Sequence, residues 1–257
     1  MSIPLSSASV ESADPIAQVK IDLAAAHRLA SLHELEEGID NHFTVTVPGN
    51  DERFLILPFG LHWSEAHASD MLVFDASGNT LDGEGFAELT AQCIHVPIHR
   101  ITGAQVVLHT HQTWALALNM LSNNRLIPAS QTAAYFDGHV SYDDNYSGFA
   151  DTLDEGERLA HLLKGKHTLF MRNHGVLVVG NSVAEAYHRL YMLERVCRTQ
   201  ILAMSTGQAL ERISDHDIAQ LQQPPEDDRH GAGDGSIDLF FSAMKRILDR
   251  QLPGYAD

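Results

Sequence analysis

The sequence predicts an α/β protein with one large domain and a largely antiparallel sheet. Helical and strand patterns follow one another along the 257 residues, several neighbouring strands are separated only by short turn sequences, and no internal repeat divides the chain. We expect a flexible tail over residues 1–15 and the folded domain over 16–206. A polar loop and a terminal helix, packed on the same domain, are expected over 207–257.

One helix and two hairpins are expected in the first third of the chain. Apolar residues at helical spacing over residues 16–38 predict an amphipathic helix, and Gly38 supplies its C-terminal stop. Two pairs of β-rich runs follow, and a turn sequence separates the members of each pair. The pairs are 42–47 with 53–58, around Pro48-Gly49-Asn50-Asp51, and the two halves of 71–82, around Ser77-Gly78-Asn79.

Helices and strands are mixed in the remainder. Residues 86–102 predict a helix that ends near Gly103, and the apolar run 104–111 predicts a buried strand. No regular period is present over Leu126–Tyr146, and the polar stretch 207–236 predicts an extended surface loop. Further helices are expected at 113–121, 155–164, 183–204 and 237–248, and a strand-turn-strand at 167–180.

Composition limits the classes of partner. The formal net charge of −17 repels phosphate backbones and anionic lipid heads, so nucleic acid and membranes are poor candidates. The N-terminus has no basic and apolar secretory pattern, and the two cysteines, Cys93 and Cys197, do not make a disulfide framework. We therefore expect a cytoplasmic protein that acts on a small molecule.

Three histidines at the ends of apolar runs predict a metal site. His109 and His111 stand at alternate positions at the end of one run, so a strand directs both imidazoles to one face. His174 interrupts two other apolar runs, and Gly175 after it allows a sharp turn or a close backbone approach. Catalytic zinc often takes three protein ligands and one water. A lone His-x-His pair more often consists of two satisfied histidines, so it is the third histidine that raises the odds of a metal site.

At these residues the chain resembles the class II aldolase/adducin family. The resemblance runs from about Asp22 to about Met204 and includes DNHFTVTVPG, the LPFG turn, IHVPIHRITGAQVVLHTH and FMRNHGVLVVG. It implies a three-layer α/β/α fold with a central, mostly antiparallel sheet. It also implies a homotetramer with active sites between subunits and one divalent ion per subunit on His109, His111 and His174. We expect zinc, with manganese or iron as alternatives.

The chain departs from the sugar-phosphate aldolases of that family. Ala91 occupies the place of their catalytic glutamate. Glu84 and Glu88 lie nearby and either could reach into the site, but neither aligns, and we expect each to be a solvated carboxylate. Asn41-His42 replaces the family's Gly-Asn. A phosphorylated sugar is therefore a poor substrate candidate, and the chain is more similar to the adducin-like bacterial branch.

Other site residues are assigned from chemistry and from the resemblance. His42 is a candidate for proton transfer because an imidazole titrates near neutral pH, although a hydrogen-bonding role in the strand is equally open. The family's proton-donating tyrosine falls at Thr132, so Tyr135, three residues later, is the second catalytic candidate. Gln131 and Arg172 are candidates for substrate binding, Arg172 through a carboxylate.

The predicted function is metal-dependent cleavage of a C–C bond, by aldol-type cleavage or decarboxylation, in a small hydroxy or oxo acid or carbonyl compound. Both reactions pass through an enolate that a divalent cation stabilises. One alternative is a three-histidine non-haem iron oxygenase, although iron usually takes a carboxylate among its ligands. The other is a non-catalytic, adducin-like binding scaffold. His95 and His99, one helical turn apart, are expected to buttress the site or pack rather than to bind metal.

Overall fold

The computed structural model describes residues 14–146, 148–223 and 234–257. The tail expected over residues 1–15 therefore lies almost wholly outside the described residues. Within them, eight strands form one sheet in the order β4-β3-β2-β1-β5-β8-β7-β6. The strands are β1 (His42–Val47), β2 (Asn50–Ile56), β3 (Leu72–Asp75), β4 (Thr80–Asp82), β5 (Val106–Thr110), β6 (Val140–Asp143), β7 (Thr168–Met171) and β8 (Gly175–Gly180).

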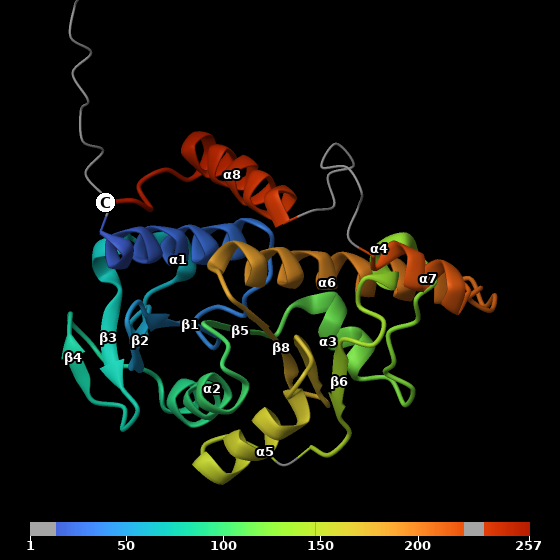
Figure 1. The fold of residues 1–257 in the computed structure, drawn as a ribbon, viewed down its shortest axis with the longest axis horizontal. Coiled ribbons are helices and arrows are strands. Elements are labelled where there is room, and N and C mark those ends of the chain that lie inside the picture. Colours follow the sequence, from blue (N-terminus) through green and yellow to red (C-terminus); the bar gives the residue numbers. More distant parts are fainter. Residues whose placement is uncertain (1–13, 147, 224–233) are drawn as a thin grey trace, which may run out of the picture.

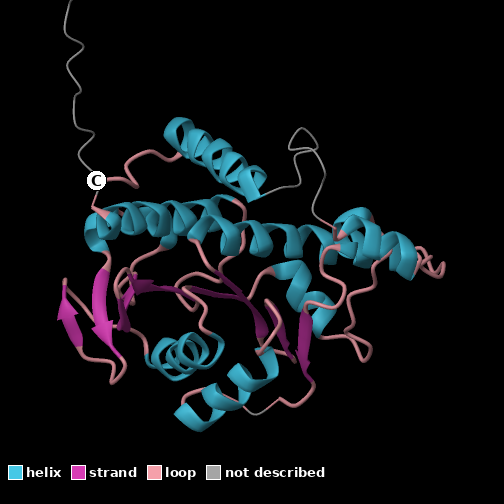
Figure 2. Ribbon diagram, viewed as in Figure 1, coloured by secondary structure: helices cyan, strands magenta, loops and turns pink. Residues whose placement is uncertain are grey.

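Helices cover both faces of this sheet, as Figures 1 and 2 show. One layer contains the long helices α1 and α6, with α8 packed outside them, and the opposite layer contains α2 and α5. Every strand pair is antiparallel except β6 with β7, which is parallel. The predicted three-layer fold with a mostly antiparallel sheet is confirmed. The helices are α1 (Pro15–Leu32), α2 (Leu89–Thr102), α3 (Thr113–Asn119), α4 (Gln131–Ala134), α5 (Leu153–Leu163), α6 (Val183–Met204), α7 (Asp215–Leu221) and α8 (Asp234–Gln251).

The hydrophobic core lies on both sides of the sheet, because alternate residues of a strand point to opposite faces. In β5, Val106 and Leu108 pack in the cluster with α1 and α6, whereas Val107 packs in the cluster with α2 and α5. His109 is the next residue on the Val107 side. The period of two therefore directs this histidine to the α2 layer at the end of the strand.

The predicted first helix ends six residues early, at Leu32 instead of Gly38. Glu34 adopts a left-handed backbone with φ of 57°, and the amides of Glu34 and Leu35 donate to the carbonyls of Ser31 and Ala30. These bonds form a Schellman motif, in which the buried Leu35 supplies the usual apolar contact. A glutamate occupies the position where glycine is expected, so the sequence rule placed the helix end too late.

Two segments predicted to be irregular contain regular structure. Residues 126–146 include α4 and β6, and the stretch 207–236 includes α7. These elements are short, and β6 owes its strand conformation to pairing with β7. Local periodicity cannot reveal such pairing because the partner lies about thirty residues away. The helix at 183–204 and the hairpin strand 42–47 have the predicted bounds.

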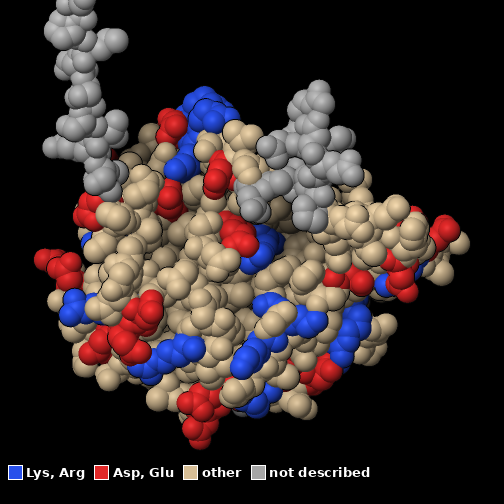
Figure 3. Space-filling model, in the orientation of Figure 1, with Lys and Arg blue, Asp and Glu red and all other residues tan. Residues whose placement is uncertain are grey.

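The surface carries both signs of charge. Lys and Arg side chains are interspersed with Asp and Glu on the face in Figure 3. Over the described ranges, no helix combines the length and the apolar character needed to cross a membrane.

Candidate metal centre

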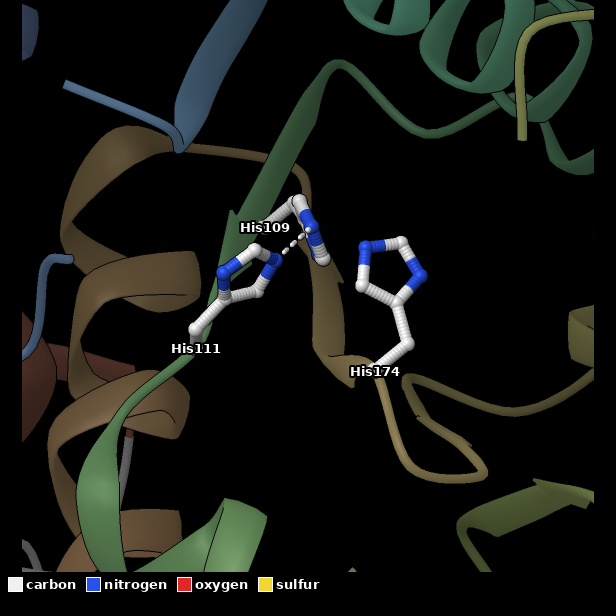
Figure 4. Close-up of side chains that lie close together, drawn as sticks. All are labelled: His109, His111 and His174. Atoms are coloured by element: carbon white, nitrogen blue, oxygen red, sulfur yellow. Dashed lines mark hydrogen bonds between the residues drawn. The ribbon is translucent and has the colours of Figure 1, made fainter. Parts of the chain in front are cut away.

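His109 and His111 lie at the end of β5, beside β1 and β8, and Figure 4 shows their rings turned toward each other. His109 is almost fully buried, and its Nδ1 lies 3.0 Å from the carbonyl oxygen of Val176 on β8. Because a carbonyl only accepts, Nδ1 carries the proton and donates it. In the neutral ring, Nε2 of His109 is therefore the nitrogen with the free lone pair.

His111 is oriented by a carboxylate. Its Nδ1 lies 2.6 Å from Oε2 of Glu37, so this nitrogen donates and Nε2 is again left free. Asn41 holds the two segments together, since its Oδ1 accepts from the amide of Glu37 at 2.9 Å and from the amide of His111 at 3.3 Å. A carboxylate on the outer nitrogen of a histidine is a common feature of protein metal sites, where it fixes the tautomer and raises the basicity of the ligand.

His174 lies in the turn between β7 and β8, with its ring directed at the other two (Figure 4). Its amide donates to the carbonyl of Met171 at 3.0 Å, which closes the turn. Asn173 takes the left-handed backbone that this turn requires, with φ of 58°. Asparagine tolerates this conformation better than most residues. The Arg-Asn-His-Gly sequence is thus the local reason that His174 projects into the site.

Gly175 is required by a close approach of the strands. A Cβ at this position would lie 2.6 Å from the carbonyl oxygen of Thr110 and 2.7 Å from Cδ2 of His111. Both distances are below normal contact, so any side chain would push β8 away from the histidines. The close-approach role predicted for this glycine is confirmed.

The donor set fits a divalent ion. Among the described residues, His109, His111 and His174 form a group whose ligand atoms all lie within 4.8 Å of one another. The Nε2 atoms of His109 and His111 are 3.1 Å apart, and both bear lone pairs in the tautomers derived above. Two lone pairs at that distance repel unless a cation lies between them. Ligands at ~2.0–2.1 Å in a tetrahedron are separated by about 3.3 Å, which is close to the spacing seen.

Two of the three histidines, His109 and His174, are held neutral, which is the form that binds metal. Burial lowers the pKa of His109 well below its ordinary value, and the neighbouring His174 and His42 lower it further. Burial and the nearby His111 lower the pKa of His174 to about 4.

The three histidines line a cavity of about 590 Å³. His42 also lines it, and its ring centroid lies 5.0 Å from that of His109, which it faces across the β1–β5 pair. Burial lowers the pKa of His42 to about 3, with further lowering by His111 and His174. Nε2 of His42 lies 3.0 Å from the hydroxyl of Thr90 and 3.8 Å from Oε2 of Glu88. The structure thus places the candidate proton-transfer residue beside the predicted metal ligands.

Other predicted site residues lie elsewhere in this chain. Gln131 and Tyr135 are at the two ends of α4, where both are exposed, and neither lines this cavity. Arg172 is the first residue of the β7–β8 turn and lies 3.7 Å from Asp144, lining a smaller pocket that His174 shares. Ala91, at the place of the family's glutamate, is fully buried in a cluster formed by α2, β2 and β3.

Sequence reasoning missed two carboxylates. Glu37 was not singled out, because its position after α1 says nothing of the contact with His111. Glu88 was expected to be solvated, yet it caps the N-terminus of α2 and lines the cavity. The sequence did contain a signal for this role. Glu88 directly precedes the first residue of α2, and an acidic side chain at that place can cap a helix.

Comparison with known proteins assigns the chain to a family. Residues 21–201 match the family described as Class II Aldolase and Adducin N-terminal domain. The chain belongs to this class II aldolase and adducin family. An aldolase II superfamily protein of Pseudomonas syringae is 35% identical, covering 96% of this chain and 98% of that one, with a TM-score of 0.85.

Two further proteins that are similar to this chain have more specific names. An L-fuculose 1-phosphate aldolase of Glaciozyma antarctica is 25% identical over 97% of this chain and 96% of its own, with a TM-score of 0.80. A Streptomyces roseochromogenus protein named 4-hydroxy-3-prenylphenylpyruvate oxygenase/4-hydroxy-3-prenylbenzoate synthase is 29% identical, covering 76% of this chain and 73% of that protein.

Proposed function

We propose that this protein is a divalent-metal-dependent lyase that cleaves a C–C bond of a small hydroxy or oxo acid or carbonyl compound. The observation that carries the proposal is the convergence of three imidazoles in a cavity, with the Nε2 atoms of His109 and His111 3.1 Å apart. When bound, a zinc, manganese or iron ion supplies a Lewis acid that polarises a substrate oxygen. Zinc is the ion we expect first, at one per subunit.

His42 is the proposed proton-transfer residue. Its Nε2 faces the cavity that the metal ligands line, and burial keeps the ring neutral and able to accept a proton. Glu88 lies on the same wall and contacts the hydroxyl of Thr90, so this carboxylate is positioned to receive a proton through that hydroxyl. We propose that His42 and Glu88 together take the place of the glutamate that Ala91 replaces.

Residues of a neighbouring subunit complete the proposed site. Family members are commonly oligomeric, and the exposed Tyr135 and Gln131 on α4 are available to a second copy of the chain. We propose a homotetramer in which these side chains reach the cavity of the adjacent subunit. Arg172 would bind a substrate carboxylate from the smaller pocket that His174 shares.

The proposal is tested with metal-loaded protein and a panel of hydroxy and oxo acids. Release of an aldehyde or of carbon dioxide measures C–C cleavage, and His42→Gln should lower kcat by about 10²–10⁴-fold without removing the ion. His216→Gln, at an exposed position on α7, is the matched control and should retain full activity. Protein that binds no metal, or cleavage that His42→Gln leaves unchanged, would contradict this assignment.

An oxygenase is the second candidate, favoured by the similarity to the Streptomyces oxygenase/synthase. The three-histidine set lacks the carboxylate that most non-haem iron sites contain. Activity that requires Fe(II) and air, with oxygen consumed in step with product, would select this candidate over the lyase.

A further inference from the structure

A chain of hydrogen bonds runs from His42 at the cavity into the interface between β1 and α2. Nδ1 of His42 lies 2.9 Å from Nε2 of His95, and Nδ1 of His95 lies 2.7 Å from Oγ1 of Thr44. The same hydroxyl lies 2.8 Å from Nε2 of His99, whose Nδ1 ends the chain 2.7 Å from the carbonyl oxygen of Ala104. The side chains of these four residues are buried, so no solvent competes for the bonds.

The carbonyl at the inner end gives the chain one direction. Ala104 can only accept, so Nδ1 of His99 donates and its Nε2 accepts the hydroxyl proton of Thr44. That hydroxyl has no second proton and must accept from Nδ1 of His95. Nε2 of His95 is then an acceptor, and the donor that it faces in this series of hydrogen bonds is Nδ1–H of His42.

The surroundings are consistent with this order. Burial lowers the pKa of His99 to about 4 and that of His95 well below its ordinary value, so both rings have a single N–H near neutral pH. Oγ1 of Thr46 lies 3.2 Å from Nδ1 of His99 and can serve as a second acceptor for the same proton. The buried carbonyl of Ala104 therefore fixes which atom donates in every hydrogen bond from His99 through Thr44 and His95 to His42.

We infer that Thr44, His95 and His99 are positioning residues that fix the tautomer of His42, so that its Nε2 presents a lone pair to the cavity. The inference rests on the proposed function and deepens it, since it states that His42 presents a hydrogen-bond acceptor to the ligand. An imidazole free to exchange tautomers would present an N–H for part of the time, and the chain removes that option.

The outer end of the chain is short of one proton. The Thr90 hydroxyl lies 3.0 Å from Nε2 of His42 and also contacts Oε2 of Glu88, but it has a single proton to donate. The hydroxyl donates to Oε2 of Glu88, which also accepts from the amides of Thr90 and Ala91 at 3.0 and 3.2 Å. Nε2 of His42 is therefore the acceptor left without a donor. A ligand hydroxyl that donates to Nε2 of His42 satisfies it, and so the site selects ligands that carry a hydroxyl at this place over ligands that carry only an acceptor oxygen.

The tautomers are measurable without any substrate. Protein labelled with ¹⁵N-histidine and loaded with zinc, which is diamagnetic, gives two-bond ¹H–¹⁵N spectra in which protonated and bare ring nitrogens are well separated. His42→Gln identifies the His42 signals by their loss. We expect a protonated Nδ1 and a bare Nε2 at His42, His95 and His99. A protonated Nε2 at His42 in the wild-type protein would overturn the inference.

Variants at Thr44 separate positioning from packing. Thr44→Val keeps the shape and removes the hydroxyl, so His95 loses its acceptor and the His42 signals should shift to a mixture of tautomers. Thr44→Ser retains a hydroxyl and should keep the wild-type spectrum. If both variants fold and give the same His42 spectrum, the chain does not set the tautomer and the inference is wrong. The wild-type spectrum decides the direction even where Thr44→Val does not fold.

The two proposals fail separately. Protein with the expected tautomers and no C–C cleavage would contradict the lyase and leave the positioning chain intact. Protein that cleaves C–C bonds with the opposite His42 tautomer would contradict the positioning chain alone.

Discussion

Two groups of three histidines lie side by side in this protein. They differ in the hydrogen-bond partners of their ring nitrogens. In the first group, His109 and His111 donate from Nδ1 to a carbonyl and to a carboxylate, and their remaining lone pairs converge with His174. In the second group, His42, His95 and His99 are bonded in series, and the hydrogen bonds among them and with Thr44 and Ala104 leave only Nε2 of His42 without a donor.

The difference shows that residue type does not decide a histidine's role. Both groups are largely buried, and burial lowers the pKa of His109 in the first group and of His95 in the second, so burial does not separate them. The first group leaves an uncompensated set of lone pairs facing a cavity, which a cation can satisfy. The second group is satisfied internally except at Nε2 of His42, and it acts through the orientation that it imposes on that ring.

Removal of two ligands of the first group has the largest expected effect. The His109→Ala/His111→Ala variant should fall from about one ion per chain to nearly none, because a single remaining imidazole cannot hold the ion. Elemental analysis of protein purified without added metal and without a histidine tag measures this. Thr44→Val, which removes the hydroxyl between His95 and His99 of the second group, is the control and should retain the ion. Equal metal content in all three proteins would mean that the two groups do not differ as described.

Acid should destabilise the protein through buried histidines that bind no metal. His27 belongs to neither group, and burial lowers its pKa from 6.5 to about 4. The unfolded chain takes up this proton near pH 6.5 and the folded chain only near pH 4, so stability is complete above pH 6.5 and falls as the pH drops through that window. The loss attributable to this residue reaches about 3 kcal/mol.

Urea unfolding between pH 7 and pH 4 tests this effect. His27→Leu should lose the corresponding part of the pH dependence, because leucine has no proton to bind. His216→Leu, at an exposed position, should keep the wild-type dependence. An unchanged slope for His27→Leu would show that His27 titrates equally in the folded and unfolded chains.

Glu37 sharpens the comparison because it is the only carboxylate that contacts a ring nitrogen of the first group among the described side chains. Glu37→Gln should weaken metal affinity by about 10–100-fold, since the amide no longer holds His111 by a charged hydrogen bond. Competition with a chelator measures the affinity. Glu34→Gln removes an equal charge from the same loop and should change the affinity little.

The smallest effect is expected from Gly175→Ala. The added Cβ meets Thr110 and His111 at under 3 Å, so we expect a loss of about 1–3 kcal/mol of stability and a displaced His111. Gly235→Ala, where no atom lies within 4 Å, should be neutral or slightly stabilising in α8. Chemical unfolding of the two variants compares them, and equal stabilities would show that β8 moves to accept the methyl group.

Much of the fold was predictable from local patterns. The long helix α6 and strand β1 have clear periods and caps, and the turn sequences at Pro48-Gly49 and Ser77-Gly78 join strands that pair as expected. The failures have a common cause. The end of α1 depends on a left-handed Glu34, and β6 depends on its pairing with β7. Neither feature has a local sequence pattern. The general rules, that a helix ends at a glycine and that a stretch without a period is irregular, therefore gave the wrong prediction at both places.

The site divides in the same way. The sequence by itself determined His109, His111 and His174, because a His-x-His pair at a strand end and a histidine before glycine in a turn are local signals that tertiary structure only has to bring together. Tertiary structure decided the rest, namely the contact of Glu37 with His111, the place of Glu88 on the cavity wall and the direction of the chain behind His42. These are pairings between segments about fifty to seventy residues apart, and a hydrogen bond has a direction only once both partners are in place.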